Sequence, residues 1–208
     1  MGYMMRNKNI RALFFDIGGV CLTNAWEYGS RQRAARHFSL DFKELDQRHH
    51  HVFGSFECGR ITLDNYLTQV VFYKKRKFTE KAFFQFMKNE SRPIPRTLSL
   101  LGSLQARGNY LLAAVNNESF ELNDYRIKKF KLNRYFTNFF SSCFLGVRKP
   151  EPRIYQLAMK MTQMEAKEIL FIDDRQVNAQ AARALGMNVI HLEHVERLPE
   201  ELKAYGIK

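Results

Sequence analysis

The chain has 208 residues, of which 45% are hydrophobic and 13% aromatic, and it carries a formal net charge of +12. This composition supports one well-buried domain with room for a small insertion, and it excludes a disordered chain. No apolar run approaches the ~18–20 residues that a membrane-spanning helix needs.

The first predicted element is a buried strand that runs from Ala12 and ends in Asp16. Four consecutive apolar residues before a carboxylate, followed by Gly18 and Gly19, are typical of a strand covered on both faces of a parallel sheet. Such a carboxylate lies just outside the carboxyl end of the strand, where open parallel sheets bind their ligands. Asp16 is therefore either a reacting group or a turn residue, and its partners decide between the two.

The following segment predicts helices and no strand. Apolar residues recur with helical spacing near residues 26–38, 41–53, 62–74 and 79–90. Thr62 and Thr79 are suitable N-caps for the last two helices, and Pro93 marks the end of the segment because residues before proline avoid helix. We expect a small helical domain at residues 25–92, inserted into an α/β core of residues 1–24 and 93–208.

From residue 95 onward, predicted helices and strands alternate. Strands are predicted at residues 110–115, 139–144, 168–172 and 187–192. Helices are predicted at 95–107, from Asn117 to about residue 131, from Pro150 onward and at 177–185. Such alternation predicts parallel strands joined by crossover helices, so the expected fold class is α/β with a Rossmann-like, doubly wound parallel sheet.

Polar residues follow these strands at the points where the strands end. They are Asp16, Asn116, Lys149 and the pair Asp173 and Asp174. Because the carboxyl ends of parallel strands meet at one edge of the sheet, we expect these side chains to share one site. Carboxylates beside a lysine and glycine-rich backbone suit Mg²⁺ and a phosphate, and a carboxylate can attack phosphorus.

These positions resemble the four motifs of the haloacid dehalogenase superfamily over nearly the full chain. Residues 13–20 match its first motif, residues 113–116 match the second in part, residues 146–155 match the third, and residues 171–174 match the fourth. The insertion at 25–92 corresponds to the small helical cap of the capped subfamily. Within the superfamily the chain is most similar to bacterial α-D-glucose-1-phosphate phosphatases, whose first motif also reads Asp-x-Gly.

The resemblance implies a Mg²⁺-dependent phosphatase of a small phosphorylated metabolite such as a sugar phosphate. Asp16 would be the nucleophile that forms an aspartyl-phosphate, and Lys149 would hold the phosphoryl group. The implied metal-binding residues are Asp16, Gly18, Asp173 and Asp174. The implied substrate-binding residues are Asn116 and Asn117, together with Arg60 from the part of the cap that turns toward the site.

Two departures from the motifs keep a second function open. Gly18 stands where most phosphatases of the superfamily have an Asp that protonates the leaving oxygen, and such acid–base help is worth ~10²–10⁴-fold in rate. Val115 stands where a Ser or Thr hydroxyl contacts the phosphoryl group, and losing one such donor costs ~10²–10³-fold. The alternative is therefore a catalytically weak or inactive phosphate- or protein-binding member of the same fold.

Three other classes fit the sequence less well. The dehalogenase branch does not need Mg²⁺, whereas Asp173 and Asp174 form a metal-type pair. A phospho-receiver domain has its acidic pair after the first strand and its phosphorylated Asp later, the reverse of the order here. The basic runs at 73–77 and 126–131 are typical of solvated helix faces, so we do not expect a nucleic-acid partner.

The cysteines and the N-terminus bear on location in the cell. Cys21, Cys58 and Cys143 lack metal-binding spacing and are odd in number, so we expect reduced thiols. The first residues are basic but include no apolar segment before a cleavage site, so we expect no secretory signal. Together these features predict a cytoplasmic protein with no membrane partner, and they do not indicate an oligomeric state.

Overall fold

A parallel sheet of five strands forms the centre of the computed structural model, which describes residues 9–207. In spatial order the strands are β3 (Asn138–Ser141), β2 (Leu111–Asn116), β1 (Ala12–Phe15), β4 (Ile169–Asp173) and β5 (Asn188–His191). Every neighbouring pair is parallel, which confirms the predicted doubly wound α/β fold. Residues 1–8 and 208, which the predicted core includes, lie outside the described residues.

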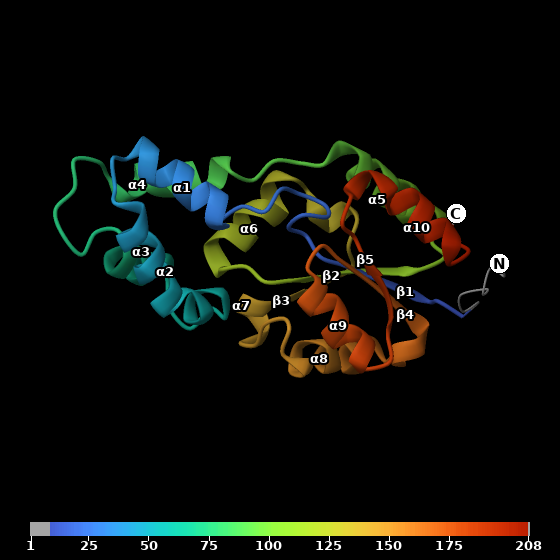
Figure 1. Ribbon diagram of the computed structural model, residues 1–208. Coiled ribbons are helices and arrows are strands. Elements are labelled where there is room, and N and C mark those ends of the chain that lie inside the picture. The colour runs from blue at the N-terminus through green and yellow to red at the C-terminus, as the bar shows by residue number, and fades with distance from the viewer. Residues whose placement is uncertain (1–8, 208) are drawn as a thin grey trace.

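Helices cover both faces of the sheet (Figure 1). Leu13 and Phe15 of β1 belong to an apolar cluster with α5 (Pro95–Arg107) and α10 (Leu198–Ala204). Phe14, which points to the other face, packs in a second cluster with α8 (Pro152–Thr162) and α9 (Gln176–Ala184). The buried strands therefore read as continuous apolar runs rather than as an alternating pattern.

The register of the sheet brings the ends of its central strands to one level. Phe15 pairs with Ala114 of β2 and with Ile172 of β4. Asp16, which follows Phe15, and Asp173, which follows Ile172 as the last residue of β4, therefore lie side by side. The backbone N–H of Asp16 still donates to the carbonyl of Ile172, at 2.8 Å, which holds the first turn after β1 against β4.

Four helices follow β1 and pack around an apolar cluster of their own. They are α1 (Tyr28–His37), α2 (Phe42–Glu57), α3 (Leu63–Val70) and α4 (Glu80–Asn89). Thr62 and Thr79 cap α3 and α4 as predicted, each accepting a backbone N–H at 3.2 Å. Leu122 of α6 (Phe120–Lys129) joins this cluster and links the inserted helices to the sheet domain. The division of the chain at residues 25–92 stays a prediction.

Two predicted boundaries are wrong around the third strand. The strand ends at Ser141, and Ser142–Leu145 form the short helix α7, because Phe144 packs on the surface against Phe120 at 5.6 Å rather than in the sheet. The next helix begins with Pro152 in its first turn instead of Pro150. Residues 146–151 are therefore a loop, which contains a cis peptide bond between Lys149 and Pro150.

Among the helices of residues 9–207, none combines the length and the apolar character that crossing a bilayer requires.

Candidate active site

Asp16 lies at the centre of the edge formed by the carboxyl ends of the strands, with both carboxylate oxygens engaged. The backbone N–H of Ile17 donates to Oδ1 at 2.7 Å, and the ammonium group of Lys149 lies 3.0 Å from Oδ2. The side chain is almost entirely buried beneath a cavity. The backbone N–H of Ile17 and the ammonium group of Lys149 therefore fix the orientation of the Asp16 carboxylate.

Lys149 is held in place at both its backbone and its ammonium group. Asn117 bonds the Lys149 backbone twice, donating to the carbonyl at 2.8 Å and accepting from the N–H at 2.8 Å. The ammonium donates to Asp173 at 2.6 Å as well as contacting Asp16. Burial by itself lowers the pKa of Lys149, but the two carboxylates outweigh burial and raise it, so the lysine is cationic.

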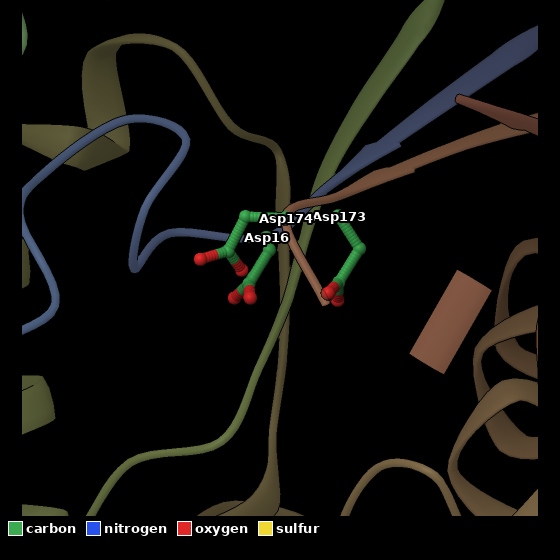
Figure 2. A group of neighbouring side chains, drawn as sticks. All are labelled: Asp16, Asp173 and Asp174. Atoms are coloured by element: carbon green, nitrogen blue, oxygen red, sulfur yellow. The ribbon is translucent and has the colours of Figure 1, made fainter. Parts of the chain in front are cut away.

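The two acidic residues at the end of β4 differ in whether a carboxylate oxygen is free to bind a ligand. Asp173 is fully buried and accepts hydrogen bonds from Arg175, Asn178 and Lys149. Asp174 accepts one bond, from Asn24 to Oδ2 at 3.0 Å, while its buried Oδ1 has no hydrogen-bond partner among residues 9–207. Figure 2 shows the carboxylates of Asp16 and Asp174 close together, with that of Asp173 set apart from them.

The donor set fits a magnesium ion. One oxygen from each of Asp16, Asp173 and Asp174 lies within 4.8 Å of the others. Burial raises the pKa of Asp16 to about 7; Lys149 opposes this, and the charges of Asp173 and Asp174 add to it. A divalent cation would relieve this crowding and would use the unpartnered Oδ1 of Asp174, and Mg²⁺ prefers carboxylate oxygens.

Two glycines give the loop after β1 its close approach to the acidic residues. Gly19 has a φ of +71°, and a Cβ at this position would overlap Oδ2 of Asp174. A Cβ at Gly18 would lie 2.5 Å from the side-chain oxygen of Asn24. Asn24 therefore occupies the space that a side chain at Gly18 would need, while its amide N–H orients Asp174.

The cavity above Asp16 has a volume of about 170 Å³ and is walled by both parts of the chain. The core contributes Asp16, Gly18, Asn117 and Lys149, and the inserted segment contributes aromatic rings and two carboxylates: Trp26, Glu27, His49, Phe53, Phe56 and Glu57. Arg126, Arg148 and Arg175 also line it. The lining therefore combines charged side chains of both signs with an apolar wall on the side of the inserted helices.

Three residues named from the sequence lie away from the cavity. Asn116 is buried, and its side chain is bonded to Asn123 and Ser141. Arg60 is exposed and donates to the carbonyl of Gly146 at 3.0 Å, outside the residues that line the cavity. Val115 is fully buried in the apolar cluster with α8 and α9. A hydroxyl at residue 115 would lie in this apolar cluster, and the rate cost assigned to Val115 stays a prediction.

A hydrogen-bonded chain backs the apolar wall. Trp26 donates to the Tyr66 hydroxyl at 2.7 Å, and this hydroxyl lies 2.7 Å from Nδ1 of His49. Burial, helped by Arg31 and His50, lowers the pKa of His49 to about 2, so the ring is neutral. Because Trp26 can only donate, Tyr66 donates its own proton to Nδ1, and the ring proton of His49 is on Nε2.

Sequence patterns missed Asn24, Glu57, Arg126 and Arg148. Arg148 directly precedes Lys149 in the third motif, so its place beside the site follows from the residues already singled out. The other three lie on helices or in a loop and do not follow a predicted strand. The apolar spacing of the sequence does not indicate the direction in which their side chains point.

Known proteins resemble this chain in sequence and in fold. Residues 10–186 match the haloacid dehalogenase-like hydrolase family. A flavin mononucleotide hydrolase of Arabidopsis thaliana is 27% identical over 97% of this chain and 80% of its own. A sesquiterpene phosphatase of Aspergillus oryzae is 28% identical over 88% of this chain and 89% of its own.

Among solved structures, a haloacid dehalogenase family enzyme from Bacteroides thetaiotaomicron in complex with magnesium and inorganic phosphate superimposes with a TM-score of 0.74. It is 22% identical, and the match covers 87% of this chain and 93% of that one. A dehalogenase gives a lower TM-score of 0.64 at 21% identity, covering 88% of this chain and 84% of that one. At these identities the likeness concerns the fold.

Proposed function

Because the chain belongs to the family of haloacid dehalogenase-like hydrolases, we propose that it is a Mg²⁺-dependent phosphatase acting on a small phosphorylated metabolite. The observation that carries this proposal is the cluster of Asp16, Lys149, Asp173 and Asp174, of which Asp16 and Lys149 line one cavity. Two relatives that match most of the chain are named as a flavin mononucleotide hydrolase and a sesquiterpene phosphatase, which supports a phosphatase reaction.

In this proposal Asp16 attacks phosphorus in line with the leaving oxygen and forms an aspartyl-phosphate, which water then hydrolyses. Lys149 binds the phosphoryl oxygens and stabilises the charge that develops on them. Asp173 keeps the lysine ammonium aimed at Asp16, and Asn117 fixes the loop that carries it. Asp16, Asp174 and the backbone of Gly18 would hold Mg²⁺, which supplies further positive charge when bound.

The cavity lining bears on the substrate class. Arg126 and Arg148 pair with Glu118 and Glu57, so Lys149 and the exposed Arg175 are the lining cations that suit a phosphate ester. Trp26, Phe53 and Phe56 offer an apolar face to the leaving group. A sugar phosphate, as in the glucose-1-phosphate phosphatase type, fits the phosphate-binding side, and a flavin or terpenyl phosphate would also use the aromatic wall. We propose a phosphomonoester and expect the aromatic wall to discriminate among these groups.

A weakly active or purely binding protein is the second candidate, because no side chain at Gly18 can act as an acid. Phosphate release from p-nitrophenyl phosphate and from a panel of sugar, flavin and prenyl phosphates separates the two. We expect Mg²⁺-dependent release that Asp16→Asn abolishes and that Asp64→Asn, an exposed residue of α3, leaves intact. Wild type indistinguishable from Asp16→Asn on every ester would favour the binding protein.

A further inference from the structure

The site as described has a nucleophile and a phosphate-binding cation but no acid for the leaving oxygen. A general acid must come within hydrogen-bond reach of that oxygen and must carry a proton at working pH. Apart from Asp16, the carboxylates that line the cavity are those of Glu27, Glu57 and Glu118. Each must be considered on its own contacts.

Glu118 and Glu27 do not suit this role. Both oxygens of Glu118 already accept hydrogen bonds at 2.9 Å, one from the N–H of Ser119 and one from the Arg126 guanidinium. Its charge is therefore committed to a buried ion pair. Glu27 lines the cavity but is exposed, so solvent reaches its carboxylate.

Glu57 has a free oxygen and a fixed position. It is the last residue of α2, and Arg148 approaches its Oε2 at 3.1 Å, while no residue from 9 to 207 donates a hydrogen bond to its Oε1. The hydroxyl of Ser142 donates to its backbone carbonyl at 2.6 Å, which fastens this end of α2 to the core. Arg148 also stacks over Phe53, with its guanidinium carbon 4.6 Å from the ring centre.

These contacts connect Glu57 to the loop that carries Lys149 as well as to the inserted helices. Arg148 is the neighbour of Lys149 in the chain, so the loop that positions the phosphate-binding lysine also positions the carboxyl group of Glu57. Glu57 and Asp16 line the same cavity, one from the side of the inserted helices and the other from the core. A substrate with its phosphoryl group on Asp16 and Lys149 would present its leaving group toward α2.

We propose that Glu57 is the general acid and base of the reaction, taking the place of the side chain that Gly18 lacks. This inference rests on the proposed phosphatase function. As Asp16 attacks, the bond from phosphorus to the leaving oxygen breaks, and that oxygen takes the proton of the Glu57 carboxyl group, giving the free alcohol. The resulting carboxylate then removes a proton from the water that attacks the aspartyl-phosphate. Phosphate departs, and Asp16 and protonated Glu57 are restored.

The surroundings of Glu57 favour the protonated form of its carboxyl group. Burial raises its pKa, the positive charge of Arg148 opposes this, and the negative charge of Glu118 adds to the rise. Arg175 and Lys149 also face Glu57 and lower its pKa, but the net direction is upward. Arg148 is then a positioning residue, and it stabilises the carboxylate that forms when the proton has left.

Two aryl esters of different leaving ability test the proposal. Phenyl phosphate releases a phenol whose pKa is about 10, close to that of a tyrosine side chain, and this oxygen needs a proton as it leaves. The phenolate of 2,4-dinitrophenyl phosphate is stable without one. We expect Glu57→Gln to lower kcat/KM for phenyl phosphate by ~10²–10⁴-fold and to change it little for the dinitrophenyl ester. Hydrolysis of the aspartyl-phosphate should also slow, giving a burst of dinitrophenolate that matches the enzyme concentration.

The controls separate acid catalysis from structure. Glu200→Gln, on the exposed side of α10, should leave both esters unaffected. Glu57→Asp retains an acid and should keep more phenyl phosphate activity than Glu57→Gln. Equal losses on the two esters, no loss on phenyl phosphate, or a Glu57→Asp variant worse than Glu57→Gln would each overturn the role of Glu57. A folded wild type that releases phosphate from neither ester would overturn the phosphatase function itself.

Discussion

Replacing Lys149 by Met should destabilise the fold severely, because it leaves buried carboxylates without their cation. The ammonium lies 3.0 Å from Asp16 and 2.6 Å from Asp173, and all three side chains are nearly or fully buried. Removing one partner of a buried ion pair costs ~3–5 kcal/mol. At a urea slope of ~3 kcal/mol per M, the unfolding midpoint should fall by at least ~1 M.

The loss should also depend on pH and on magnesium. The pKa of Asp16 is already raised to about 7 from its ordinary value of 3.8, and removing the cation raises it further. A carboxyl group whose pKa is higher in the folded state binds more protons there, so stability falls as pH rises through that window. The variant should therefore lose less stability at pH ~5 than at pH ~8, and Mg²⁺ should restore part of the loss at the higher pH.

Urea unfolding followed by fluorescence at both pH values, with and without Mg²⁺, measures these effects. Lys128→Met is the matched control, because its side chain is 75% exposed and its ammonium pairs with the exposed Asp124; a change within ~0.5 kcal/mol is expected. A Lys149→Met variant as stable as wild type at pH ~8 without Mg²⁺ would refute the reasoning that this lysine neutralises the buried carboxylates.

Three further substitutions test separate parts of the site. Asn24→Ala removes the donor that orients Asp174 and should weaken Mg²⁺ binding by ~10–100-fold in calorimetric titrations, whereas unchanged affinity would mean that Asn24 does not support the metal. Tyr66→Phe leaves the buried Nδ1 of His49 without its donor and should lower the free energy of unfolding by ~1–3 kcal/mol in urea titrations; an unchanged midpoint would argue against the hydrogen-bonded chain. Val115→Thr puts a hydroxyl into an apolar cluster and should cost ~1–3 kcal/mol with no gain in phosphate release, and a faster enzyme would show that residue 115 does face the substrate.

The sheet and the acidic cluster could be predicted because both depend on local pattern. Apolar runs that end in Asp16 or Asp173 identify buried parallel strands, and the geometry of such sheets gathers the following residues at one edge. Val115 shows the limit of this reasoning, since neighbouring residues of a strand face opposite sides and a shift of one position changes a ligand into a core residue. The pattern also does not show that the side-chain amide of Asn116 is bonded to Asn123 and Ser141.

The other half of the cavity could not be predicted. Helical spacing indicates which residues of α2 are apolar, but not that Glu57 ends the helix beside Arg148. That contact depends on how the inserted helices pack against the core, through Leu122 and the bond from Ser142 to the end of α2. Asn24 was equally hidden, because its role follows from the space that Gly18 leaves open.

Covalent trapping at Asp16 tests the central claim most directly. The protein would be quenched during turnover of phenyl phosphate with Mg²⁺, reduced with borohydride and digested, and the peptide that contains residue 16 analysed by mass spectrometry. An aspartyl-phosphate at Asp16 predicts conversion of this residue to homoserine, only when ester and Mg²⁺ are both present. Phosphate release at full rate with Asp16 unmodified, or with the label on another carboxylate, would contradict the account.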